Sequence, residues 1–207
     1  MLERSPASGQ NAYLTALLAP LSGDDAPGHA TALLARFGSI AGVAAARTRE
    51  LTEVLGKESP LPVHIAAVRR LLHAGLREHV ARRPLDTADP GLLQFVIAHF
   101  SGLQHEEMLA LFGGADGCFL DDQTLAMGSS RRMEFDPSVL FRRACQVGAV
   151  QVVLAHNHPS GAATPSGDDL DSTRRVARDG RLLGIALRDH LIVSGNAVFS
   201  MHRAGLL

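Results

Sequence analysis

The sequence predicts an α/β fold of the α+β kind, in which a helical module precedes a mixed β-sheet flanked by helices. In the first part, leucines such as Leu14, Leu17 and Leu18 recur at helical spacing, which marks one apolar face of a helix. In the second part, β-rich apolar runs alternate with helical segments. With 46% hydrophobic and 20% charged residues among 207, the composition is that of an ordinary globular protein.

Residues 1–82 are expected to form the helical module. The helical segments that we expect there are, in order, residues 12–21, 29–38, 48–56 and 62–83. Gly38 and Gly56 stand directly after the second and third apolar patterns, where glycine commonly ends a helix. Residues 83–90, rich in proline and aspartate, are expected to be a linker.

Residues 91–207 are expected to form the sheet domain. The segment over 136–149 opens with Asp136 as the N-cap and Pro137 at the first helical position, a typical helix start. The run at 150–156 is apolar on both faces, as in a central strand covered on both sides. The other expected elements are a helix over 91–100, strands over 106–112 and 118–128, a helix over 166–184, and two strands within 185–201.

Composition excludes several classes of protein. The net charge of -1 gives no overall basic field that would attract nucleic acid. No apolar run approaches the roughly 18 residues of a membrane span. The N-terminal stretch has a charge at Glu3 and no apolar core of a signal peptide. Cys118 and Cys145 lack metal-binding spacing, so we expect reduced thiols in a cytoplasmic protein.

The segment LAHNHPSGAATPSGDDLD, residues 154–171, carries the chemistry. His156 and His158 are two residues apart at the end of a strand, which places both rings on one face. The prolines and glycines that follow can turn the chain, so that Asp169 falls in the first turn of the next helix. Two imidazoles and a carboxylate suit a zinc ion with an open fourth position.

Two simpler interpretations of the same residues stay open on this evidence. Ser166 and Asp169 have the spacing of a capping box, with aspartate in place of glutamate. Two neighbouring histidines are also common in surface loops without a metal. The adjacent letters HNH do not indicate an HNH nuclease, because the residues that define that site are scattered along a ββα unit.

The pattern His156-Asn-His158, then Ser166, then Asp169 resembles the JAMM motif of MPN-domain zinc metalloproteases. Together with the later string LGIALRDHLIV, it resembles the bacterial RadC family over residues 85–207. The resemblance implies a JAMM/MPN domain with layering similar to that of cytidine deaminases. It also implies one Zn²⁺ held by His156, His158 and Asp169, with Ser166 helping to bind an oxyanion.

A hydrolase of this kind also needs a general base upstream, on the first strand of the domain. In the string QHEEMLALF, Glu106 matches the family's glutamate best. Glu107 is an alternative, although a shift of one residue points it to the opposite face. Glu134 is a more distant alternative.

Two adjacent residues of a later strand, Asp189 and His190, also match the family. We expect both side chains to be buried, hydrogen-bonded and supportive of the site without binding the metal.

The resemblance implies a metallopeptidase-like hydrolase that cleaves a peptide or isopeptide amide. The alternatives are a DNA-associated repair factor, in line with the family's name, and a catalytically inactive MPN scaffold. RadC-type chains begin with a helix-hairpin-helix-like segment that meets DNA phosphates through a glycine-rich turn. Here Gly56 is present, but Glu58, Pro60 and Pro62 follow, which weakens the expectation of DNA binding. A peptide or protein substrate is therefore the expected partner, and no membrane contact is expected.

Overall fold

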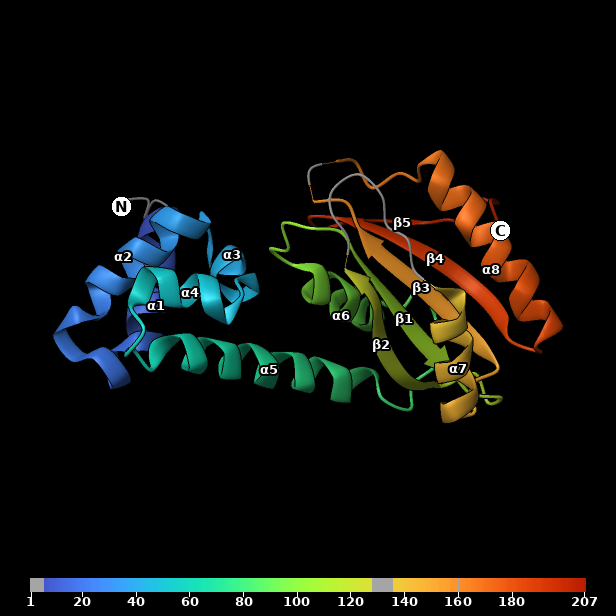
Figure 1. Ribbon diagram of the computed structural model, residues 1–207, viewed down its shortest axis with the longest axis horizontal. Helices are drawn as coiled ribbons and strands as arrows, with labels where there is room; N and C mark the ends of the chain where they lie inside the picture. Colours follow the sequence, from blue (N-terminus) through green and yellow to red (C-terminus); the bar gives the residue numbers. More distant parts are fainter. Residues whose placement is uncertain (1–5, 128–135, 160) are drawn as a thin grey trace. The chain divides into compact units, whose positions relative to one another are not determined.

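The structure is a computed structural model that describes residues 6–127, 136–159 and 161–207 (Figure 1). Its contacts divide the chain into two compact units. The first comprises Met1–Leu72 with Ser101–Leu103, and the second comprises His73–Phe100 with Gln104–Leu207. None of the described helices has the length and apolar character needed to cross a membrane. Both cysteines are free thiols.

The first unit is helical, and its core is made by leucines at helical spacing. Leu14, Leu18, Leu33 and Leu51 are almost completely buried in it. Its helices are α1 (Pro6–Ser22), α2 (Ala26–Phe37), α3 (Ile40–Ala45), α4 (Thr48–Leu55) and the first part of α5 (Leu61–Val80), with a 3-10 turn at Gly23–Asp25. The sequence pattern did not predict α3, because six residues are too few to show a period; the hydroxyl of Ser39 caps it.

The second unit is built on a five-stranded sheet with the order β2-β1-β3-β4-β5. The strands are β1 (Glu107–Gly113), β2 (Phe119–Met127), β3 (Gln151–Asn157), β4 (Ala186–Ser194) and β5 (Ala197–Ser200). Only the β3–β4 pair is parallel; the other neighbours are antiparallel. The predicted mixed sheet is therefore confirmed, and β3 is its central, almost fully buried strand.

Helices cover both faces of this sheet (Figure 1). Helices α7 (Pro137–Val147) and α8 (Gly167–Leu182) pack on one face, where Leu140 and Val176 join the core that contains Met108 and Leu154. Helix α6 (Pro90–Phe100) packs on the other face, where its His99 reaches Glu107. Helix α8 connects β3 to the parallel strand β4, so the end of β3 meets the beginning of α8.

The segment that the sequence predicts as a linker, residues 83–90, is bound to the second unit. The amide of Leu85 donates to the carbonyl of Gly117 at 2.9 Å, and the Thr87 hydroxyl donates to Asp189 at 2.8 Å. The division between the units falls earlier, inside α5. The last turns of α5 belong to the second unit because Arg77 pairs with Asp122 at 2.6 Å.

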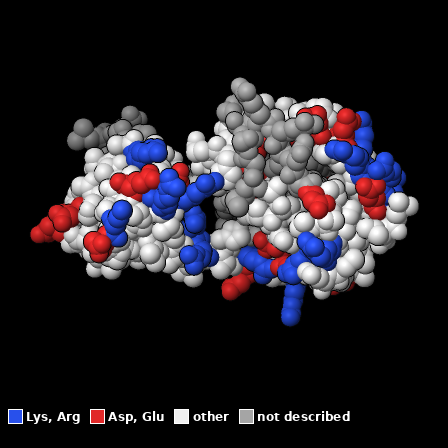
Figure 2. Space-filling model, in the orientation of Figure 1, with Lys and Arg blue, Asp and Glu red and all other residues white. Residues whose placement is uncertain are grey.

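Charges of both signs are interspersed on the surface. On the face of each unit in Figure 2, Lys and Arg side chains lie beside Asp and Glu side chains. In the second unit, Arg77 and Arg143 both pair with Asp121. This distribution agrees with the net charge of -1 and gives the face in view no field of a single sign.

Asp189 is the most heavily bonded acid of the second unit and is completely buried. One carboxylate oxygen accepts the backbone amides of His190 and His202 at 2.7 and 3.0 Å. The other accepts the hydroxyls of Thr87 and Ser200 at 2.8 and 2.5 Å. One side chain thus joins β4, the segment before α6 and the turn after β5.

We predict that Asp189→Ala lowers the free energy of unfolding of the second unit by about 3 kcal/mol or more, because it leaves four donors without their acceptor, and two of them belong to the buried residues His190 and Ser200. Thr87→Val, which removes a single donor, should cost only about 1 kcal/mol. Native-state hydrogen exchange of the β4 amides measures both, since the chain has no Trp and its one Tyr lies in the first unit. Unchanged β4 protection in Asp189→Ala would contradict the prediction.

Candidate metal centre

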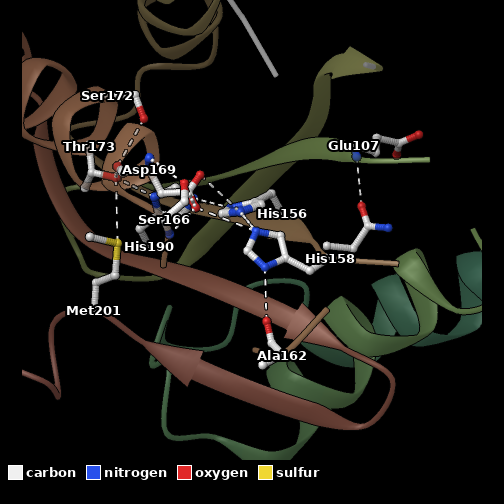
Figure 3. A network of polar contacts seen from close by, with 11 residues as sticks. Glu107, His156, His158, Ala162, Ser166, Asp169, Ser172, Thr173, His190 and Met201 are labelled. Carbon is white, nitrogen blue, oxygen red and sulfur yellow. Dashed lines mark hydrogen bonds and ion pairs between the residues drawn. The ribbon is translucent and has the colours of Figure 1, made fainter. Parts of the chain in front are cut away.

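The structure brings His156, His158 and Asp169 together where β3 ends and α8 begins (Figure 3). The Nε2 atoms of the two histidines are 2.9 Å apart. Carboxylate oxygens of Asp169 lie 3.3 Å from Nε2 of His156 and 3.6 Å from Nε2 of His158. Ligand atoms of one tetrahedral zinc ion stand roughly 3.3–3.6 Å apart. The two nitrogen–oxygen distances match this spacing, the two nitrogens stand closer together, and one ligand atom from each residue lies within 4.8 Å of the others.

The local structure explains why these side chains converge. His156 and His158 alternate with Asn157 along the end of β3, so both rings leave the same face. Ser166 is the N-cap of α8, which places Asp169 at the third helical position. The predicted first-turn position of Asp169 is thus observed, and the turn between the histidines and α8 directs it back to the end of the strand.

In the structure, Asp169 takes part both in the capping box of α8 and in the group that it forms with His156 and His158. The Ser166 hydroxyl accepts the amide of Asp169, while one Asp169 oxygen accepts the amide and the hydroxyl of Ser166 at 2.8 and 2.7 Å. The other carboxylate oxygen faces His156. Burial alone would raise the pKa of Asp169, but its contacts with His156 and Ser166 outweigh burial and hold the pKa well below its usual range. The capping role therefore leaves Asp169 an ionised acceptor.

His158 presents an acceptor to the same point. Its Nδ1 lies 3.1 Å from the carbonyl oxygen of Ala162. A carbonyl oxygen only accepts, so Nδ1 carries a proton, and Nε2 is the ring nitrogen whose lone pair can bind a cation. An imidazole lone pair and a carboxylate are ligands that zinc prefers. The donor set thus fits a zinc ion, and His156 supplies a third nitrogen.

His190 supports His156 from the neighbouring strand β4. The Nε2 of His190 lies 2.8 Å from Nδ1 of His156, and its Nδ1 lies 2.6 Å from the hydroxyl of Thr173 on α8. Burial, together with the nearby His156, lowers the pKa of His190 to about 3. The structure therefore places His190 beside a candidate ligand as a neutral ring. Asp189 points away from it, to the other face of β4.

The two adjacent glutamates occupy different environments. Glu107 is buried and accepts from His99 at 2.6 Å and from Thr124 at 3.1 Å. Burial opposes its ionisation, but the hydrogen bond and charge of His99 outweigh burial and lower the pKa of Glu107. Because Met108 pairs with His156 across the strands, Glu107 lies on the opposite face from His156. Glu106 is half-buried.

Asn157, between the two histidines, clamps the chain on both sides of Glu106. Its Oδ1 accepts the amide of Glu107 at 2.8 Å, and its Nδ2 donates to the carbonyl of His105 at 2.9 Å. The side chain is almost completely buried. The backbone that carries Glu106 is therefore tied to β3 next to the histidines. The third candidate base, Glu134, lies outside the described residues.

The sequence pattern identified the residues that converge, but not all of the residues whose hydrogen bonds hold them in place. Thr173 was not singled out, although it stands four residues after Asp169, on the same side of α8. The role of Asn157 was also not visible, because a clamp between β3 and the chain before β1 depends on strand pairing. His190 was expected to support the site, and the structure places it in contact with His156.

Comparison with known proteins shows similarity over the whole chain. A family described as RadC-like JAB domain matches residues 88–206. A UPF0758 protein of Bordetella petrii is 32% identical over 209 residues, covering 100% of this chain and 93% of the relative. A UPF0758 protein of Burkholderia thailandensis is 34% identical over 212 residues, covering 99% and 79%. One from Shouchella clausii is 30% identical over 176 residues, covering 85% and 76%.

The pKa of His190 predicts how stability depends on pH. The unfolded chain binds a proton on His190 near its ordinary pKa of about 6.5, whereas the folded chain does so only near 3. Stability should therefore fall as the pH decreases from 6.5 toward 3, by about 1.4 kcal/mol per pH unit for this proton. Hydrogen exchange of β4 in the presence of a chelator, at pH 7 and pH 5, measures it. His190→Gln should show a shallower dependence; equal slopes would contradict the assignment.

Proposed function

This chain belongs to the RadC-like JAB domain family, and we propose that it is a zinc-dependent hydrolase that cleaves a peptide or isopeptide amide bond. The observation that carries the proposal is the convergence of His156, His158 and Asp169 on one point. Two imidazoles and one carboxylate would leave a fourth position open, as catalytic zinc sites do.

His156, His158 and Asp169 would hold the zinc ion. When bound, the ion supplies Lewis acidity: it makes water a stronger acid near neutral pH and polarises a carbonyl group. Asp169 suits this role because it stays ionised. His158 suits it because the carbonyl of Ala162 keeps its proton on Nδ1.

Glu106 is the proposed general base. Only Glu107 lies between it and Met108, the partner of His156 across the β1–β3 pair. Strand alternation, continued one residue before β1, assigns Glu106 to the face of His156. Asn157 holds the backbone on both sides of it. Glu107 is less suited, because its carboxylate accepts from His99 and Thr124 on the other face.

The protein groups divide the work of hydrolysis between them. Glu106 takes a proton from the attacking water and returns it to the amine nitrogen as the carbon–nitrogen bond breaks. Ser166 stands beside Asp169 with its hydroxyl available to stabilise an oxyanion, in exchange for its bond to that carboxylate. A catalytically inactive scaffold with the same fold is the alternative that activity measurements separate from this proposal.

We predict that the zinc-supplemented, desalted chain retains one zinc ion, and that His158→Ala and Asp169→Ala retain far less, because each removes a ligand. Elemental analysis of the purified proteins measures the zinc content. His202→Ala, an exposed histidine of the same unit, is the matched control and should retain the wild-type content. A wild-type chain without zinc would remove the basis of the proposal; equal zinc in all variants would place the ion elsewhere.

We predict that Glu106→Gln lowers the rate of amide hydrolysis at least about 100-fold while leaving zinc bound, because it removes the proton carrier and no ligand. Zinc-loaded proteins are incubated with a synthetic peptide library, and new N-termini are quantified by mass spectrometry. Glu107→Gln, the matched change on the other face, should stay within a few-fold of wild type. Cleavage that persists in Glu106→Gln would contradict the assignment, and no cleavage by zinc-loaded wild type would favour the inactive scaffold.

A further inference from the structure

A chain of three hydrogen bonds, two of them buried and one partly buried, runs from the backbone of α8 to the centre of the site (Figure 3). It begins at the carbonyl oxygen of Asp169, which lies 2.5 Å from the hydroxyl of Thr173. That hydroxyl lies 2.6 Å from Nδ1 of His190, and Nε2 of His190 lies 2.8 Å from Nδ1 of His156. Thr173, His190 and His156 are each at most 1% exposed, so water does not compete for these bonds.

The acceptor at the beginning of the chain, the carbonyl of Asp169, determines which group donates in each hydrogen bond. The carbonyl of Asp169 has no hydrogen, and two oxygens at 2.5 Å need a proton between them. The Thr173 hydroxyl has one hydrogen and donates it to this carbonyl at 2.5 Å, since the other acceptor, Sδ of Met201, is weaker and lies 3.7 Å away. Its oxygen is then left to accept, which requires that His190 carry a proton on Nδ1.

The same reasoning assigns the position of the proton on each of the two imidazole rings. A completely buried His190 without a carboxylate partner is neutral, so a proton on Nδ1 leaves its Nε2 as an acceptor. Nδ1 of His156 must donate to it, so an imidazole ring with a single proton carries none on Nε2. We infer that Thr173 and His190 are positioning residues, which fix His156 in the Nδ1–H tautomer and keep its Nε2 lone pair available for a cation. The functional meaning of this tautomer rests on the proposed metal centre, whereas the assignment of the tautomer rests on the hydrogen bonds alone.

The fixed tautomer matters because a competing arrangement exists within the site. With its proton on Nε2, His156 would donate to Nε2 of His158, 2.9 Å away, or to Asp169, 3.3 Å away. The three groups would then satisfy one another without an ion. The chain from Thr173 opposes this arrangement, because it would leave two buried ring nitrogens facing each other without a proton. It therefore favours a site of three acceptors, which only a cation satisfies.

The test removes the hydroxyl of Thr173 and keeps the shape of the side chain nearly unchanged. In Thr173→Val the His190 ring loses its acceptor and can turn its proton to Nε2, which forces the proton of His156 onto Nε2. Thr173→Ser keeps the hydroxyl and should behave as wild type. Thr124→Val, the same change at a threonine that contacts Glu107 and no member of the cluster, is the matched control.

Two measurements are made on the full chain. Long-range ¹H–¹⁵N correlation spectra of the chelator-treated protein near pH 8 report which nitrogen of His156 carries the proton. Competition with a chromophoric chelator reports zinc affinity. We expect an unprotonated Nε2 in wild type and Thr173→Ser, a proton on Nε2 in Thr173→Val, and zinc affinity about 10–100-fold lower in Thr173→Val alone.

The outcomes separate this inference from the proposed function. A proton on Nε2 of His156 in the wild-type spectrum would overturn the inference even if zinc binds. Wild-type zinc affinity in Thr173→Val, or an equal loss in Thr173→Ser, would overturn it as well. A wild-type chain that shows the inferred tautomer but binds no zinc would support the hydrogen-bond chain and count against the hydrolase instead.

Discussion

The carboxylate of Asp169 is the group on which both the local fold and the site depend. One of its oxygens closes the first turn of α8 with Ser166, and the other faces the imidazole of His156. Since α8 is the connection between the parallel strands β3 and β4, the residue that begins the helix also fixes the helix at the end of β3. The start of α8, the connection from β3 to β4 and the positions of the candidate metal ligands thus all depend on one side chain.

Local chemistry made much of this arrangement predictable. The Asp136-Pro137 start of α7, the apolar strand β3 and the capping spacing of Ser166 and Asp169 are each determined by residues that are close in sequence, and the structure contains each of them. The convergence of His156 and His158 followed from strand alternation. What could not be predicted depends on pairing between distant segments: that Glu107 lies on the face away from His156 follows only from the register of β1 against β3. Helix α3 was missed because it is too short to show a period.

Strand β4 divides its polar residues between the two faces of the sheet. Asp189 binds Thr87, Ser200 and two backbone amides on one side, while His190 binds His156 and Thr173 on the other. Neither side chain is exposed, and both are hydrogen-bonded, as buried polar groups require. On one face, β4 therefore binds the segment between α5 and α6 through Asp189. On the other face, it binds the candidate metal centre through His190.

The clamp formed by Asn157 bears on how this family can change over evolution. In His156-Asn157-His158 the odd and even positions serve opposite faces: the rings meet Asp169, and the amide meets the backbone beside Glu106. Insertion or deletion of one residue within β3 would turn the rings toward α6 and the amide toward α8. A point substitution alters one of these two sets of contacts, whereas a change in the length of this strand would disrupt both at once, so variation in length is expected in the loops outside it.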